Sequence, residues 1–273
     1  MLRAFRIITL ILFVVTVGLF AMFYIHDKRT TDTTIPEIKI EGDMIEVGIK
    51  STDKDLLKGV TAFDGKDGDI TEKVIVESIS PFIEKGVCEV TYAVCDSNKH
   101  VAKNTRTITY KDYESPKFTM DRALVFSVNE EIDILSSMGA VDSIDGDISD
   151  KVVLIATDYT ADTVGVFTVN MQATNSKGDI VYLNLPLHIE ELSVSAPVVE
   201  LKEYIMYVKK GENPDFRNNI AAVSTRGGQE LKYESYISTG FDNSKPGVYS
   251  VHYYVTSELG SQAHSILTVV VEE

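Results

Sequence analysis

The chain has 273 residues, of which 44% are hydrophobic and 25% are charged. These are ordinary values for a folded globular protein, so they exclude extensive disorder and fibrous repeats. With 26 Lys and Arg against 41 Asp and Glu, the formal net charge is −15. Because such an acidic chain repels phosphate backbones, we exclude nucleic acid as a partner. Two cysteines are too few for a disulfide scaffold or a cysteine-rich zinc site.

The first expected element is a helix that crosses a membrane. Residues 7–25 (IITLILFVVTVGLFAMFYI) carry no charge, and at ~1.5 Å per residue they span ~28 Å, about the hydrocarbon thickness of a bilayer. A cleaved signal peptide is the alternative, but its apolar region is usually shorter and precedes a small-x-small site. Arg3 and Arg6 before the span predict a cytoplasmic N-terminus. We therefore expect a single-pass cell-membrane protein with residues 1–6 as a cytoplasmic tail, residues 26–35 as a linker and extracellular C-terminal domains.

The remaining chain contains three copies of one unit. Pro36, Pro116 and Pro197 are 80 and 81 residues apart. Two sets of glycines keep nearly the same spacing: Gly68, Gly146 and Gly228, and Gly86, Gly165 and Gly247. Units of this length can bury a core of their own. We predict three tandem domains, at residues 36–115, 116–196 and 197–273, of which the third has the most divergent sequence.

Within each unit the hydrophobic period is two. In the third copy, one set of alternate residues is apolar: Tyr249, Val251, Tyr253 and Val255. Such alternation is typical of a half-buried strand. Polar turns, such as residues 96–98 and 175–178, separate the last two strands of a unit. We expect no long amphipathic helix after residue 30. The predicted fold is all-β, with three antiparallel β-sandwiches after one transmembrane helix.

The best-defined motif is the run D-x-x-D-G-D-I-[ST], followed some 15 residues later by a strand of the form G-V-[YF]-x-V-x-Y-x-V-x-D-S-x-G. These motifs resemble the bacterial Ig-like repeats of Gram-positive surface proteins, which also occur as accessory domains in some insecticidal crystal proteins. The resemblance covers residues 36–273 and is weaker in the third copy, which lacks the aspartates. It implies tandem Ig-like β-sandwich domains that serve as a stalk, a spacer or an adhesive module.

Six aspartates in the first two copies are the candidate metal ligands: Asp64, Asp67 and Asp69, and Asp142, Asp145 and Asp147. Three carboxylates within six residues repel one another unless they are solvated, hydrogen-bonded to turn amides or shared by a hard cation, for which calcium is the candidate. We prefer the alternative of a plain turn, in which aspartates accept backbone N–H groups and a glycine adopts a positive φ. The third copy has Ser224, Gly227 and Gln229 at these positions and should bind no calcium there.

Cysteines and aromatic residues give weaker indications. Cys88 and Cys95 are seven residues apart in one predicted strand, so they lie on opposite faces, ~23 Å apart, and cannot form a disulfide with each other. We expect Cys88 in the core and Cys95 on the outer face. Tyr233, Tyr236 and Tyr254 are candidates for exposed rings that stack on a sugar.

The sequence does not predict an enzyme. Its five histidines are scattered singly and match no metal-ligand or triad spacing: His26, His100, His188, His252 and His264. Residues 51–54 fit S-x-x-K, but no K-T-G or S-D-N motif accompanies them.

We predict a non-catalytic, membrane-anchored bacterial cell-surface protein whose repeats form a stalk or an adhesion module. No cofactor other than calcium is expected, and the partner is an extracellular protein or glycan. The alternatives are an accessory subunit of a polysaccharide or secretion machine of the cell envelope, and a glycan-binding module. The sequence leaves the oligomeric state open.

Overall fold

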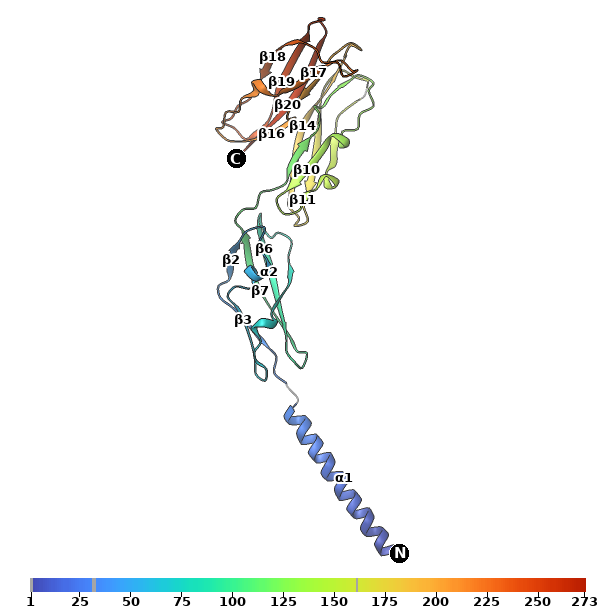
Figure 1. Ribbon diagram of the computed structural model, residues 1–273, viewed down its shortest axis with the longest axis vertical. Coiled ribbons are helices and arrows are strands. Elements are labelled where there is room, and N and C mark those ends of the chain that lie inside the picture. Colours follow the sequence, from blue (N-terminus) through green and yellow to red (C-terminus); the bar gives the residue numbers. More distant parts are fainter. Residues whose placement is uncertain (1, 31–32, 161) are drawn as a thin grey trace. The chain divides into compact units, whose positions relative to one another are not determined.

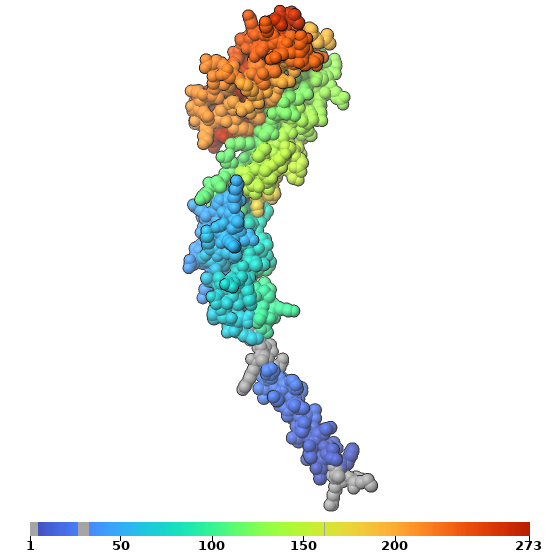
Figure 2. Space-filling view, in the orientation of Figure 1, coloured from blue at the N-terminus to red at the C-terminus, as the bar shows by residue number. Residues whose placement is uncertain are grey.

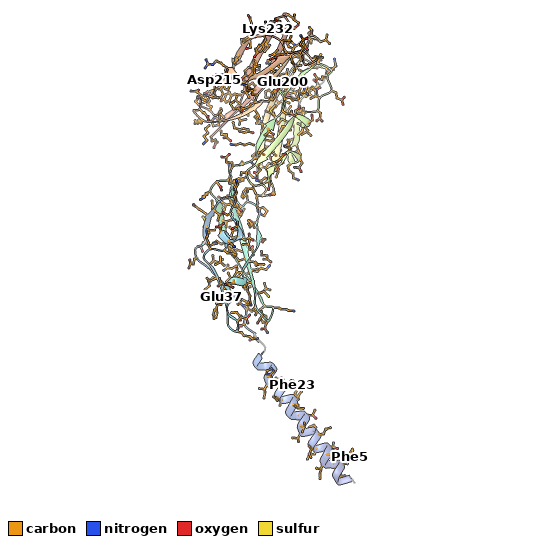
Figure 3. All side chains as sticks on the ribbon, in the orientation of Figure 1. Phe5, Phe23, Glu37, Glu200, Asp215 and Lys232 are labelled. Atoms are coloured by element: carbon orange, nitrogen blue, oxygen red, sulfur yellow. The ribbon has the colours of Figure 1, made fainter. Side chains whose placement is uncertain are left out.

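The computed structural model describes residues 2–30, 33–160 and 162–273. Its first element is helix α1, Leu2–Thr30. The apolar segment Phe5–His26 of this helix is long enough to cross a membrane, as an anchor or as a signal sequence. The side chains of residues 5–26 are exposed, as Figure 3 shows for Phe5 and Phe23.

Helix α1 is longer than the predicted span, because it continues into the sequence predicted as a cytoplasmic tail and as a linker. Residue 1 of that tail and residues 31 and 32 of that linker lie outside the described residues.

The chain divides into two compact units, Met1–Lys111 and Asp112–Glu273. Apart from α1, a short helix α2 (Asp53–Leu56) and four 3-10 turns, the regular elements of the described residues are strands (Figure 1). The predicted all-β fold with one N-terminal apolar helix is therefore confirmed. Among the described residues there are three hydrophobic clusters, one for each repeat. The domain boundaries at residues 116 and 197 remain a prediction.

The first repeat forms two facing sheets. One sheet has the order β1-β3-β4, and the other has the order β2-β7-β6-β5. The bounds of these strands are β1 Glu37–Ile40, β2 Met44–Val47, β3 Val60–Asp64, β4 Gly68–Asp69, β5 Ile75–Ile79, β6 Val87–Cys95 and β7 Val101–Tyr110. Alternate residues of β6 enter the core, because successive side chains of a strand point to opposite faces: Cys88, Val90, Tyr92 and Val94.

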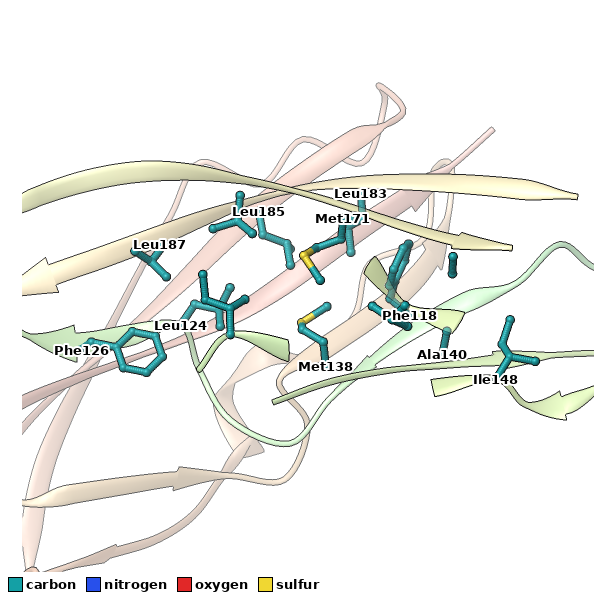
Figure 4. Packing of buried hydrophobic residues seen from close by; sticks show 14 of the residues in the cluster. Phe118, Leu124, Phe126, Met138, Ala140, Ile148, Met171, Leu183, Leu185 and Leu187 are labelled. Atoms are coloured by element: carbon teal, nitrogen blue, oxygen red, sulfur yellow. The ribbon is translucent and has the colours of Figure 1, made fainter. Parts of the chain in front are cut away.

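The second repeat has the same arrangement, with sheets β11-β10-β8 and β12-β13-β14-β9. Its strands are β8 Lys117–Met120, β9 Val125–Ser127, β10 Met138–Asp142, β11 Gly146–Asp147, β12 Val153–Thr157, β13 Gly165–Thr174 and β14 Ile180–Glu190. The core lies between the sheets, where Met171 and Leu185 of the long hairpin face Phe118 and Met138 (Figure 4).

The third repeat keeps this order in sheets β15-β17 and β16-β20-β19-β18. Its strands are β15 Val198–Leu201, β16 Ile205–Lys209, β17 Ile220–Ser224, β18 Tyr233–Thr239, β19 Gly247–Ser257 and β20 Gln262–Glu272. Its alternating residues behave as predicted, since Val251, Tyr253 and Val255 are buried.

One strand pair in each repeat differs from the predicted antiparallel arrangement. The second strand of each repeat pairs in parallel with the last strand: β2 with β7, β9 with β14 and β16 with β20. The first strand of the same repeat instead pairs with the facing sheet, as β1 does with β3. The chain therefore crosses from one sheet to the other between its first two short strands.

The two cysteines lie as the alternation of β6 predicts. Cys88 is fully buried and Cys95 is exposed, and the two do not form a disulfide with each other.

Removing the hydroxyl of Tyr92 should destabilise the first sandwich. This ring is 0% exposed, and its hydroxyl donates to the carbonyl oxygen of Leu56 (2.7 Å) and accepts from Nη2 of the buried Arg106 (2.8 Å). We expect Tyr92→Phe to lower the free energy of unfolding by about 1–2 kcal/mol, because it breaks two buried hydrogen bonds. Urea unfolding of the full chain in detergent measures this value. Tyr182→Phe is the control, since that ring is 67% exposed, and an equal effect of both changes would contradict the assignment.

Candidate functional site

The first aspartate turn joins β3 to β4. Asp64, the last residue of β3, is only 1% exposed. Its Oδ1 accepts the N–H groups of Lys66 (2.8 Å) and Asp67 (2.9 Å), and its Oδ2 accepts the hydroxyl of Thr34 (3.1 Å). Gly68 then adopts a φ of 74°, where a Cβ atom is unfavourable. The first carboxylate is thus an acceptor that fixes the shape of the turn.

The next two aspartates accept hydrogen bonds at the far side of the turn. Asp67 accepts both the N–H and the hydroxyl of Ser97, each at 2.7 Å. Since Ser97 lies between β6 and β7, this carboxylate ties the turn of one sheet to the hairpin of the other. Asp69 accepts the N–H of Thr71 at 2.9 Å.

The second repeat contains the same arrangement. Asp142 accepts the N–H of Asp145 (3.0 Å) with Oδ1 and the side-chain amide of Asn175 (3.1 Å) with Oδ2. Asp145 accepts the N–H and the hydroxyl of Ser176, both at 2.6 Å. We call the Asp67–Ser97 and Asp145–Ser176 contacts the two turn–hairpin ties. They join residues 30 and 31 positions apart in the sequence.

These hydrogen bonds lower the pKa of four turn carboxylates below the ordinary aspartate value: Asp64, Asp67, Asp69 and Asp147. The largest cause is the N–H of Asp67 for Asp64, the Ser97 hydroxyl for Asp67, and the Ser149 hydroxyl for Asp147. Because the folded pKa lies below the unfolded value of about 3.9, these groups stabilise the fold above roughly pH 4. That contribution is lost as the pH falls through the folded pKa.

The third repeat builds its turn without carboxylates. Thr225 Oγ1 accepts the N–H of Gln229 at 3.2 Å, and Gly228 adopts a φ of 82°. Across residues 2–30, 33–160 and 162–273, no three His, Cys, Asp or Glu side chains are arranged to hold a metal ion. Since all six aspartates accept hydrogen bonds, either within the turn or from the opposite hairpin, the geometry favours the plain turn, and calcium binding stays the untested alternative.

A second cluster of ionisable groups lies in the second compact unit, where the second and third repeats meet. We define the histidine cluster as His188 and Glu190 of β14, His252 of β19 and His264 of β20. Glu190 Oε1 lies 2.7 Å from His264 Nδ1, and His264 Nε2 lies 2.9 Å from His252 Nδ1. The His188 ring centroid lies 5.6 Å from that of His252 and 5.8 Å from that of His264.

The protein environment disfavours charge on two of these rings. Burial, followed by the charges of the other two histidines, lowers the pKa of His188 to about 4. Burial and then the charge of His264 also lower the pKa of His252. The hydrogen bond from His264 lowers the pKa of Glu190. The environment of the cluster therefore favours the neutral forms of His188 and His252 and the ionised form of Glu190.

Two of the three predicted surface tyrosines form a stack with this cluster. Tyr254 of β19 lies directly opposite Tyr236 of β18 on one side and His264 of β20 on the other. The Tyr236 and Tyr254 rings are 4.7 Å apart, and the Tyr254 and His264 rings are 4.6 Å apart, all nearly parallel. Tyr236 is 63% exposed on β18, at the edge of its sheet. Tyr233 is exposed on the same strand but has no part in this stack.

Sequence reasoning did not find the histidine cluster. The spacing of the histidines gave no motif, since Glu190 and His264 are 74 residues apart. The alternation of the strands gave one usable signal. It places His188, His252 and His264 on the outward faces of three long strands, so these faces carry a histidine each.

These repeated two-sheet units define a protein of tandem Ig-like β-sandwiches. No protein-family model matches its sequence. It is 30% identical over 139 residues to the pesticidal crystal protein Cry22Aa of Bacillus thuringiensis, which covers 50% of this chain and 18% of that protein. It is 43% identical over 61 residues to an uncharacterised 81.3 kDa protein of Acholeplasma phage L2, which covers 22% of this chain and 8% of that protein. The chain thus spans less than a fifth of either relative, and the first one agrees with the resemblance to crystal-protein repeats.

Two solved structures with similar folds are distantly similar to this chain. Drosophila N-cadherin EC1-3 aligns with 89% of this chain and 90% of its own, at 13% identity and a TM-score of 0.32. The M60 catalytic domain with CBM51 domains from Clostridium perfringens ZmpB aligns with 88% of this chain and 31% of its own, at 14% identity and a TM-score of 0.24. At these scores we draw no functional argument from either structure.

Breaking a turn–hairpin tie should weaken its sandwich. We expect Asp145→Ala to lower the melting temperature of the second sandwich by several degrees, because both bonds to Ser176 are lost. Scanning calorimetry of the full chain measures this shift. Asp150→Ala is the matched control in the same repeat, since its carboxylate is 75% exposed and pairs with the neighbouring Lys151. Equal shifts for the two variants would show that the tie contributes nothing specific.

Calcium should leave the melting temperatures unchanged, because N–H and hydroxyl donors of the turns and hairpins already bond the six aspartates. The measurement compares full chain in 1 mM calcium with full chain in EDTA. A site at ten times its Kd would stabilise its sandwich by about 1.4 kcal/mol. A rise confined to the first and second repeats, with the third as internal control, would instead establish the aspartate turns as calcium sites.

Proposed function

We propose that this chain is a membrane-anchored, non-catalytic cell-surface protein whose Ig-like sandwiches act as a stalk or an adhesive module. The observation that carries the proposal is helix α1, whose apolar side chains are exposed from Phe5 to His26 and which precedes the β-sandwiches in the chain. In water such a surface would be costly, whereas a bilayer covers it. The helix therefore supports a membrane anchor, with the sandwiches on one side of the membrane.

The polar groups of the helix also support a simple tether. The hydroxyl of Thr9 donates to the carbonyl oxygen of Phe5 at 2.9 Å, and that of Thr16 donates to Leu12 at 2.5 Å. Because both hydroxyls bond within their own helix, neither needs a partner helix inside the bilayer. This favours an anchor over an accessory subunit whose span packs against a membrane machine.

Glycan binding is the second candidate function. It rests on the Tyr236 ring, which is 63% exposed on the edge strand β18 and stacks on Tyr254 with one face. A ring with one free apolar face can pack against the apolar face of a sugar. Polar side chains that line the hollow beside this stack, such as Glu191 and Gln262, are of the kind that bond sugar hydroxyls.

Cys95 gives a direct test of membrane topology. It is exposed on the first sandwich, while Cys88 is buried, so a membrane-impermeant maleimide should react at Cys95. In intact bacteria that express the full chain, we expect labelling of this residue and retention of the protein in the membrane fraction. Cys95→Ser is the control for specificity. Labelling that appears only after lysis would place the sandwiches in the cytoplasm and overturn the proposal.

Replacement of residues 5–26 by an unrelated transmembrane helix separates the anchor from the accessory subunit. A tether tolerates the exchange, so surface labelling and any measured adhesion of the cells should persist. Loss of the measured adhesion, with unchanged surface labelling at Cys95, would favour the accessory subunit.

A further inference from the structure

The contact between the second and third repeats is made at both ends of β20. Near the C-terminal end of this strand, Lys117 Nζ lies 3.4 Å from Glu272 Oε1. At the same end, the N–H of Phe118 donates to the hydroxyl of Tyr207 at 2.8 Å. Near the N-terminal end, the histidine cluster makes the contact. Figure 2 shows the two repeats, in yellow-green and in orange, adjoining over this region.

The apolar part of this contact is modest. Ile205 and Val270 of the third repeat are partly buried against the hydrophobic cluster of the second repeat. Beside it lies a hollow of about 580 Å³, lined by residues of both repeats, with His264 among them. Polar contacts therefore make up much of what holds the two repeats together.

The hydrogen-bond chain of the histidine cluster allows one proton between His252 and His264, because one of the two facing ring nitrogens must accept the hydrogen bond. Since Glu190 accepts from His264 Nδ1, we assign the proton to that nitrogen, so the neutral His264 ring accepts at Nε2 from His252 Nδ1. If both rings are protonated, two N–H groups face each other across 2.9 Å. His188, which lies against both rings, would add a third positive charge.

The surroundings do not supply a matching set of carboxylates. From β14 and the segment after it the cluster is faced by Glu190 and Glu191, and from β19 and β18 by the neutral rings of Tyr254 and Tyr236. The charged residues that line the hollow of about 580 Å³ next to His264 are two arginines and two glutamates: Arg122, Glu130, Glu200 and Arg226. Arg122 Nη2 lies 3.8 Å from Glu130 Oε1, so the charges of these two side chains largely offset each other.

We propose that the histidine cluster makes the contact between the second and third repeats a pH-sensitive joint, which is closed near neutral pH and opens on mild acidification. Protonation of His188 and His252 puts like charges into a half-buried contact that one close carboxylate cannot balance. The third repeat then separates from the second while each sandwich stays folded. This joint does not depend on membrane anchoring or on any ligand.

The direction of the pH effect follows from linkage. The pKa of His188 falls to about 4 in the closed contact, from an ordinary value of about 6.5 for an exposed histidine. Between these values the open state binds more protons, so the closed state is fully favoured above about pH 6.5 and is weakened as the pH falls towards 4. His252, whose pKa is also lowered, acts in the same direction over the same pH range, whereas Glu190 contributes only below its ordinary pKa of 4.5.

The size of the effect is set by the partial burial of His188. A full difference of 2.5 between the two pKa values would correspond to a change of roughly 300-fold over the whole range. Because the ring is only half-buried and solvent screens its charge, we expect the closed-to-open ratio to fall about tenfold between pH 7.5 and pH 5.

Distance measurement between two spin labels tests the joint. The full chain, in lipid nanodiscs, carries Cys95→Ser to remove the exposed thiol, with Lys151→Cys on the second repeat and Lys232→Cys on the third. Both lysines are exposed, and Lys232 is marked in Figure 3. We expect one narrow distance distribution at pH 7.5 and a broader, shifted one at pH 5, with unchanged far-ultraviolet circular dichroism.

His188→Gln and His252→Gln, made singly, should each weaken the response to pH. The matched control is His100→Gln in the first sandwich, where His100 Nδ1 lies 2.7 Å from Asp96 Oδ2, and this change should leave the response intact. The joint is refuted if the distance distribution is the same at both pH values, or if both cluster variants titrate like the parent chain. Loss of the strand signal at pH 5 would also refute it, since the sandwiches would then unfold.

Discussion

Each of these small sandwiches depends on holding a sheet of two or three short strands against a larger one. In the first two repeats the turn–hairpin ties supply a polar clamp, because Asp67 and Asp145 each accept two hydrogen bonds from a serine of the opposite hairpin. The third repeat has a different polar contact, in which Asn219 before β17 bonds both the N–H and the carbonyl of Glu203 between β15 and β16. The third repeat also contacts the second repeat through residues of β20.

Much of the fold could be predicted from the sequence, because long strands with one buried face repeat a period of two. The alternation of residues 248–255 and the turn at Asp142 each placed an element correctly. The parallel pairing of β2, β9 and β16 could not be predicted, since three to five residues are too few to show alternation. The candidate site divides in the same way. The bonds from aspartates to N–H groups two or three residues further on could be interpreted from spacing. The turn–hairpin ties and the histidine cluster could not, because both form through tertiary contact.

The two groups of ionisable residues respond to different acidities. Four turn carboxylates, Asp64, Asp67, Asp69 and Asp147, have a lowered pKa and lose their stabilising role only below about pH 4, while the histidine cluster responds between neutral and mildly acid pH. A chain with this distribution keeps its sandwiches folded over the range in which the contact between two of them changes. The sites are separated by chemistry as well as by position, since one consists of carboxylates bonded to turn amides and the other of imidazoles packed against each other.

The parallel pairing in each sandwich has a mechanical consequence. Because the second strand runs alongside the last strand in the same direction, the chain enters this pair at one end and leaves it at the other. A force applied between the ends of a repeat therefore pulls the two strands past each other. The hydrogen bonds between β16 and β20, which pair over five residues, would then be loaded together in shear and not opened one after another. Since unfolding under load is governed by the barrier and not by equilibrium stability, even a small sandwich can resist tension in this direction.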